Sequence, residues 1–127
     1  MKRVMVITNY PDSSWLKTVV EALALVAQVE AAAEQAVWTA VKKTLYDLIL
    51  IDTTNINGDV VTLVKEVHQF LPTLPIVVFT TSPTWRRARE LFLAGATDYV
   101  RRSLEKETIL SVCQEAWERV PHDRGEG

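Results

Sequence analysis

Short apolar runs alternate along the chain with longer segments in which apolar residues recur every three or four positions. The clearest runs cover residues 4–7, 48–51 and 76–79, and a weaker one lies at residues 99–100. Each run is too short for a helix, and unbroken apolar runs of this length are typical of strands covered on both faces. A further weak strand is predicted at about residues 28–32. The pattern therefore predicts five strands.

The longer segments predict helices, and several of them carry end signals. The polar loop at residues 11–14 can cap a helix that follows it, and Pro83 suits the first turn of a helix that stops at Gly95. Ser103 can cap the last helix. The predicted inner stripe of that helix consists of apolar residues, namely Ile109, Leu110, Cys113, Ala116, Trp117 and Val120.

The predicted elements follow one another as strand and helix, repeated five times. Such alternation favours an α/β fold in which helices cover both faces of a parallel sheet. Residues 1–120 are predicted to form one domain, since there is no internal repeat, low-complexity tract or second domain. Residues 121–127 are polar and contain glycine, and are interpreted as a tail or the stump of a linker.

Composition narrows the classes of function. The chain has 127 residues, of which 48% are hydrophobic, enough for one well-packed core. With 14 basic and 16 acidic residues the formal charge is −2, which argues against direct nucleic-acid binding and against a polybasic membrane contact. Cys113 is the only cysteine, so neither an internal disulfide nor a cysteine zinc site is expected. A cytoplasmic protein without a secretion signal is predicted.

Polar residues follow the predicted strands where the strands end. In doubly wound sheets ligands bind beyond the carboxyl ends of the strands. The residues predicted to meet there are Thr8 and Asn9, Asp52, Thr80 and Thr81, and Arg101 and Arg102. An acid, several hydroxyls and a guanidinium would then share one crevice.

Three segments resemble the receiver domains of two-component response regulators. Residues 47–52 (DLILID) resemble the strand that ends in the phosphoacceptor aspartate, which implies that role for Asp52. Residues 75–81 (PIVVFTT) resemble the strand that ends in the switch hydroxyl, here Thr80. Residues 94–103 (AGATDYVRRS) are similar to the family signature that contains the switch aromatic, here Tyr99, and the catalytic lysine, here Arg102. The resemblance implies a three-layer, doubly wound flavodoxin-like (βα)5 fold with strand order 2-1-3-4-5.

The departures from the family pattern affect the phosphorylation pocket. The two adjacent acids that hold a divalent metal in the family are Thr8 and Asn9 here, and the lysine is Arg102. Phosphoryl transfer to a carboxylate needs charge neutralisation, normally by Mg²⁺ and a lysine. We therefore expect no resident metal or other cofactor, at most weak Mg²⁺ binding, and slow or absent phosphorylation of Asp52.

Arg102 offers an alternative to the metal. Its planar guanidinium is predicted to pair with Asp52 in bidentate geometry and to hold the pocket in one arrangement without phosphate. Trp15 and Trp85 are predicted to flank the crevice.

A basic cluster lies around the fourth helix and the fifth strand. Its residues, with nearby acids, are Arg86, Arg87, Arg89, Asp98, Arg101 and Glu105. Their simplest interpretation is a solvated helix face. The resemblance implies instead a surface for protein partners, such as a histidine kinase or an effector domain, or for a homodimer through helix four, strand five and helix five.

Three functions remain open. The first is an atypical receiver that signals through protein contacts with weak or no phosphorylation. The second is an ordinary response regulator that accepts phosphate on Asp52. The third is a flavodoxin-like module for a small ligand, against which the lack of a glycine-rich phosphate loop argues. An enzyme is least expected, because no nucleophile, base and orienting group converge in the crevice.

Overall fold

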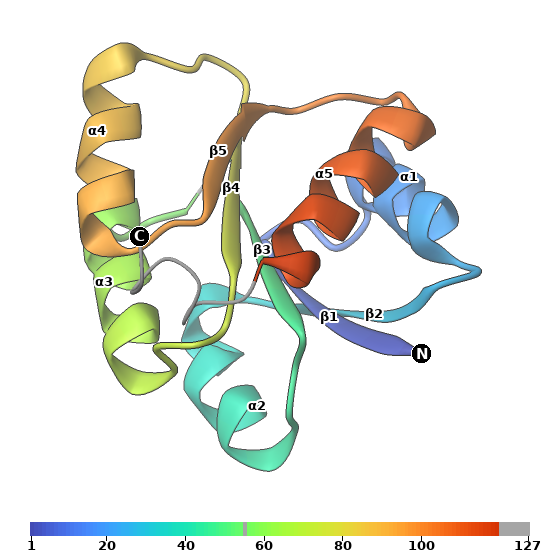
Figure 1. The fold of residues 1–127 in the computed structure, drawn as a ribbon, viewed down its shortest axis with the longest axis horizontal. Helices are drawn as coiled ribbons and strands as arrows, with labels where there is room; N and C mark the ends of the chain where they lie inside the picture. Colours follow the sequence, from blue (N-terminus) through green and yellow to red (C-terminus); the bar gives the residue numbers. More distant parts are fainter. Residues whose placement is uncertain (55, 120–127) are drawn as a thin grey trace.

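A parallel five-stranded sheet lies between two layers of helices in the computed structural model, which describes residues 1–54 and 56–119 (Figure 1). The strands are β1 (Lys2–Ile7), β2 (Ala27–Ala32), β3 (Leu48–Asp52), β4 (Ile76–Thr80) and β5 (Asp98–Arg101). The helices are α1 (Ser14–Leu23), α2 (Val37–Lys43), α3 (Val60–Phe70), α4 (Trp85–Ala94) and α5 (Lys106–Glu118), and a short 3-10 helix, η1 (Glu34–Ala36), precedes α2. The strand order is β2-β1-β3-β4-β5, as predicted.

The sheet is apolar on both faces because alternate residues of each central strand enter different cores. Val4 and Val6 of β1 pack under α1 and α5, whereas Met5 and Ile7 pack under α2, α3 and α4. All four side chains are fully buried. This explains the unbroken apolar runs of the sequence, since a strand covered on both faces has no polar side.

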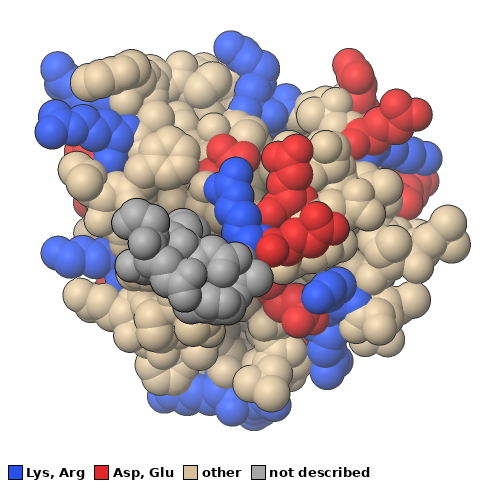
Figure 2. All heavy atoms as spheres, in the orientation of Figure 1, with Lys and Arg blue, Asp and Glu red and all other residues tan. Residues whose placement is uncertain are grey.

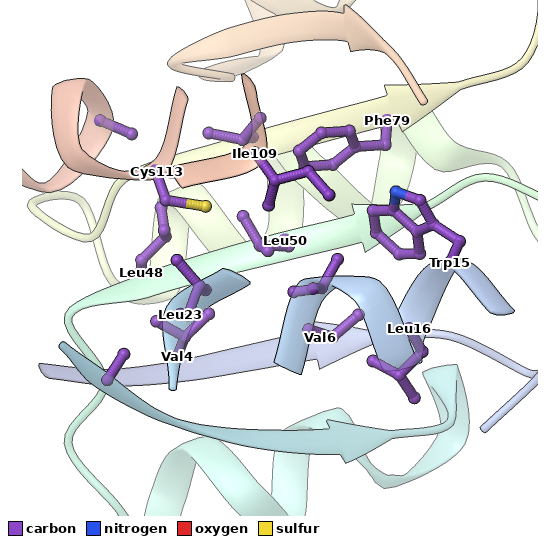
Figure 3. Packing of buried hydrophobic residues seen from close by; sticks show 14 residues of the cluster. Val4, Val6, Trp15, Leu16, Leu23, Leu48, Leu50, Phe79, Ile109 and Cys113 are labelled. Atoms are coloured by element: carbon purple, nitrogen blue, oxygen red, sulfur yellow. The ribbon is translucent and has the colours of Figure 1, made fainter. Parts of the chain in front are cut away.

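The core under α1 and α5 extends to the carboxyl edge of the sheet (Figure 3). There the rings of Trp15 and Phe79 lie 5.0 Å apart between their centroids, at an angle of 56°. Cys113 and Ile109 bring α5 onto the same core and are fully buried. Burial raises the pKa of the Cys113 thiol to about 12, so this side chain acts as an apolar residue.

Two predicted helix ends were wrong by a few residues. The predicted cap in the loop before α1 is Ser13, whose hydroxyl accepts from the backbone N–H of Leu16. Pro83, however, lies outside α4, which Thr84 caps by accepting from the N–H of Arg87. Ser103 does not cap α5 either: its hydroxyl accepts from the N–H of Glu105, and the helix begins only at Lys106. In both places the helix begins later than predicted.

Gly95 ends α4, as predicted, and its φ of 121° is one that other residues rarely adopt. A Cβ atom at this position would also lie 2.4 Å from Cγ of His68, so the close packing of α3 against the end of α4 requires glycine. Val120 and the predicted tail at residues 121–127 lie outside the described residues. None of the described helices is both long enough and apolar enough to cross a membrane.

Candidate functional site at the carboxyl edge of the sheet

Strand register brings four of the predicted residues to one edge of the sheet. Ile7 pairs with Ile51, and Asp52 pairs with Phe79, so β1, β3 and β4 end at nearly the same level. The residues at this level are Thr8 after β1, Asp52 and Thr80 at the ends of β3 and β4, and Arg102 after β5. The predicted convergence of these segments is therefore seen in the fold.

Asp52 is fully buried, and both of its carboxylate oxygens are engaged. Oδ2 accepts a hydrogen bond of 3.1 Å from the hydroxyl of Thr8, and Oδ1 accepts one of 3.1 Å from the backbone N–H of Thr54. The Thr8 hydroxyl also accepts from the N–H of Tyr10, which orients its proton toward Asp52. A carboxylate buried in this way needs such donors to replace its water.

Arg102 lies against Asp52, but the predicted bidentate pairing was wrong. Nε of Arg102 is 3.7 Å from Oδ1 of Asp52, a distance at which the charges attract without a hydrogen bond. Nη1 of Arg102 donates instead to the hydroxyl of Thr54, at 2.8 Å. The guanidinium also stacks on Trp15, with Cζ 4.9 Å from the ring centroid. We call Thr8, Asp52, Thr54 and Arg102 the Asp52 pocket.

The two tryptophans predicted to flank the crevice behave differently. Trp15 is 3% exposed and forms one wall of the crevice under Arg102. Trp85 is 79% exposed at the start of α4, where its side chain faces solvent. Trp15 is therefore the natural optical reporter of the Asp52 pocket.

The side chain of Asn9 is hydrogen bonded to Glu34, a residue that the sequence analysis did not identify. Its amide Nδ2 donates to Oε1 of Glu34 at 3.0 Å, and its Oδ1 accepts from the backbone N–H of Glu34 at 3.4 Å. Glu34 also accepts from the backbone N–H groups of Asn57 and Gly58. The hydrogen bonds from Asn57 and Asn9 lower the pKa of Glu34 below its usual value, because they favour the charged carboxylate.

The other side of the crevice holds the predicted switch residues. The hydroxyl of Thr80 accepts from the N–H of Ser82, and the hydroxyl of Tyr99 accepts from the N–H of Thr84 at 3.4 Å. Thr80 and Tyr99 line a cavity of about 400 Å³ between β4, β5 and α4. Thr81 is exposed, and its carbonyl accepts from Nη1 of Arg101. The Tyr99 side chain therefore borders open space.

The donor set of the Asp52 pocket does not fit Mg²⁺. This ion requires an octahedral shell of oxygens and usually takes one or more carboxylates together with water. Here one carboxylate, Asp52, has both oxygens engaged and a guanidinium 3.7 Å away, which repels a divalent cation. Among residues 1–54 and 56–119, no group of three or more acidic, histidine or cysteine side chains is arranged to hold a metal.

The predicted basic cluster is exposed on the outer face of α4. Arg86, Arg87 and Arg89 all face solvent, and Nη1 of Arg87 lies 4.0 Å from Glu90 of the same helix. Exposed apolar side chains, Trp85, Phe92 and Leu93, lie on the same helix. In Figure 2 basic side chains gather at the corner occupied by α4, whereas acidic ones gather over α5. We call the exposed residues of α4 together with Arg101 the α4 surface; they are Trp85, Arg86, Arg87, Arg89, Glu90, Phe92, Leu93 and Arg101.

Asp98 and Glu105, the predicted acidic partners of this cluster, lie in different settings. Asp98 is half-buried at the start of β5, and its Oδ1 accepts from the N–H of Tyr99. Glu105 is exposed immediately before α5. Neither forms an ion pair with the arginines of α4 among the described residues.

Comparison with solved structures finds receiver domains of the same fold. A response regulator receiver domain protein (CheY-like) from Methanospirillum hungatei JF-1 superposes with a TM-score of 0.81 at 19% identity, covering 100% of this chain and 99% of that one. The beryllofluoride-activated NtrC4 receiver domain dimer gives 0.81 at 19% identity, covering 93% and 98%. At these identities the likeness establishes the shared fold. No protein-family model matches the chain.

The sequence comparison finds a transcriptional regulatory protein. The transcriptional regulatory protein ZraR of Salmonella typhimurium (strain LT2) is 28% identical over 87 residues, which is 68% of this chain and 19% of that protein. The chain thus spans less than a fifth of this curated relative's length. The recognised resemblance and the fold are confirmed by these similarities.

Proposed function

We propose that this chain is a receiver-like signal-transduction module of a two-component system that acts through protein contacts, with weak or no phosphorylation at Asp52. Its similarity to receiver domains and to a transcriptional regulator supports the signalling class. The chemistry of the Asp52 pocket supports the finer part of the proposal.

The observation that carries the proposal is the engagement of Asp52. To attack a phosphoryl group, one oxygen must be free and the approaching negative charges must be neutralised. In this pocket Thr8 and Thr54 occupy the two oxygens, and the nearby positive charge belongs to a guanidinium already bonded to Thr54. The Arg102 guanidinium offsets the charge of Asp52 at rest, and Thr8 and Asn9 provide no second carboxylate to recruit Mg²⁺. The resting arrangement is thus favoured over the phosphorylated one.

Intact-mass measurement after incubation with acetyl phosphate and Mg²⁺ tests the proposal. We expect the mass of the protein to stay unchanged under conditions in which an ordinary receiver domain gains one phosphoryl group. A phosphoryl adduct that disappears in the Asp52→Asn variant would overturn the proposal. It would support the alternative, an ordinary response regulator that accepts phosphate on Asp52.

The α4 surface is the proposed docking site for protein partners, which would be a histidine kinase, an effector domain or a second copy of this chain. Exposed apolar side chains beside three arginines favour a partner with a mixed apolar and acidic face. In a homodimer through α4, β5 and α5, Asp98 and Glu105 would supply the opposite charges.

Analytical ultracentrifugation of the wild type and of the Arg89→Glu variant tests the dimer. The variant should shift the equilibrium from dimer to monomer.

A further inference from the structure

Asn9 and Glu34 form a reciprocal pair across two neighbouring loops. Asn9 follows β1, and Glu34 opens η1 directly after β2. The register of these strands sets the two residues side by side, since Ile7 pairs with Ala32 and the N–H of Thr8 donates to the carbonyl of Ala32. The Asn9 side chain then both donates to the Glu34 carboxylate and accepts from the Glu34 backbone. These two hydrogen bonds fix the orientation of the Asn9 side chain, and the first of them also holds the Glu34 carboxylate.

The same carboxylate reaches a third loop. Oε1 of Glu34 accepts a hydrogen bond of 2.8 Å from the N–H of Asn57, and Oε2 accepts one of 3.3 Å from the N–H of Gly58. Both donors belong to the segment between β3 and α3, which follows Asp52. The fit is close: a Cβ atom at residue 58 would lie 3.3 Å from Oε2 of Glu34. One carboxylate therefore joins the loops that follow β1, β2 and β3.

A bound divalent ion would join such loops by drawing their oxygens into one coordination shell. This chain instead presents backbone N–H groups, which repel a cation and bind an anion. A carboxylate is the complementary group, and hydrogen bonds from N–H donors to a charged acceptor are stronger than those between neutral groups. The loops around Asp52 are thus built to be held by a negative side chain.

We infer that Glu34 is a positioning residue that fastens the loops around Asp52 by hydrogen bonds, so that the receiver pocket is ordered without a metal ion. Glu34 forms this clasp with Asn9, Asn57 and Gly58, and the clasp holds the segment that carries Thr54 over Asp52. Because it requires neither phosphate nor a partner protein, the inference stands independently of the proposed signalling role.

Amide hydrogen exchange followed by NMR tests the clasp in the wild type and in the Glu34→Ala variant. The Asn57 amide should be protected in the wild type, equally in EDTA and in millimolar Mg²⁺. In Glu34→Ala it should exchange roughly tenfold faster or more, because the acceptor that closes this loop is lost. The amide of Leu50 in the central strand β3 serves as the internal reference for global unfolding.

Three further variants keep the test decisive. Gln35→Ala, an exposed neighbour in the same 3-10 helix, should exchange as the wild type does. Glu34→Gln and Glu34→Asp replace the alanine variant should it fail to fold, and each should lose part of the Asn57 protection. Equal exchange of Asn57 in the wild type and all Glu34 variants would overturn the inference. So would protection that appears only when Mg²⁺ is added.

Discussion

The two sides of the crevice at the carboxyl edge differ in how closely their residues match the receiver pattern. On the β1 side, where receiver domains carry adjacent acids, Thr8 donates to Asp52 and Asn9 bonds to Glu34. On the β4 and β5 side a hydroxyl, Thr80, and an aromatic ring, Tyr99, still line one cavity. The β1 side thus departs from the receiver pattern, whereas the β4 and β5 side matches it.

This difference separates two tasks that one pocket usually combines. Gathering Mg²⁺ and phosphate needs several negative charges in one place, and those charges are costly to bury without the ion. A movable aromatic side chain needs only space and a weak hydrogen bond. We propose that this chain lacks the first task and can still perform the second, with Arg102 and Glu34 stabilising the resting pocket.

Restoring the acids should produce the largest effect. In the triple variant Thr8→Asp, Asn9→Asp, Arg102→Lys, we expect Mg²⁺ affinity to rise by at least about a hundredfold, because each added carboxylate contributes more than about 1.4 kcal/mol beside a divalent ion. Without Mg²⁺ the variant should be less stable than the wild type, since the carboxylate introduced at position 9 would also face Glu34. Calorimetric titration with Mg²⁺ measures the gain.

The matched control is Thr8→Ser, Asn9→Ser, Arg102→Lys, which alters the same positions without adding charge. It should bind Mg²⁺ no better than the wild type does. If the control gained as much affinity as the triple variant, removal of the guanidinium, and not the added carboxylates, would account for the gain.

Removing Arg102 should have the next largest effect. Arg102→Ala leaves the buried Asp52 carboxylate without a counter-charge and exposes Trp15, and should lower the free energy of unfolding by about 2–3 kcal/mol. Adding Asp52→Asn should recover much of that loss, because no charge then remains to be neutralised. Urea unfolding of the single and double variants measures both. Equal instability with and without Asp52→Asn would mean that packing, not charge, is what Arg102 supplies.

The Glu34 clasp predicts a smaller, pH-dependent effect. The pKa of Glu34 in the folded chain lies below its usual 4.5, so its contribution is fully present above that value and is lost as the pH falls through the lowered pKa. Glu34→Gln should therefore be less stable than the wild type by about 1 kcal/mol at pH 7, the scale of a hydrogen bond near the surface. The gap should close at acidic pH. A gap that stayed constant across the titration would contradict an ionised clasp.

The smallest effect is expected on the switch side. Tyr99→Phe removes a hydroxyl whose only hydrogen bond among the described residues spans 3.4 Å, so stability should change by less than about 0.5 kcal/mol. Thermal unfolding of the variant tests this. A loss larger than about 1 kcal/mol would show that the tyrosine is fixed and would remove the contrast between the two sides.

The fold could be predicted from the sequence because each central strand is apolar throughout. Residues 48–51 and 76–79 have no polar face, and runs this short and unbroken are typical of strands with helices on both sides. The ends of helices were less predictable. Proline and serine are both common at helix starts, which is why Pro83 and Ser103 were predicted there. The observed starts of α4 and α5 depend on local hydrogen bonds of Thr84 and Ser103, which the spacing of residues does not reveal.

Only those parts of the site that follow directly from the positions of the strand ends could be predicted. Thr8, Asp52 and Arg102 met as expected because β1, β3 and β5 end at the same edge of the sheet, with β4 between β3 and β5. The orientation of Arg102, however, depends on Trp15 and Thr54. Glu34 gave no signal of its own, since it lies 25 residues from Asn9 in a stretch of alanines and glutamates. The proposed role of Glu34 depends on the backbone N–H groups of residues 57 and 58, which carry no signal in the sequence.

The most direct test of a pocket ordered without metal is an NMR titration of the wild-type chain with Mg²⁺ and then beryllofluoride. We predict that the amides of Asp52, Thr54 and Arg102 keep their chemical shifts through millimolar concentrations of both. Saturable shifts of these three amides, abolished by Asp52→Asn, would contradict it.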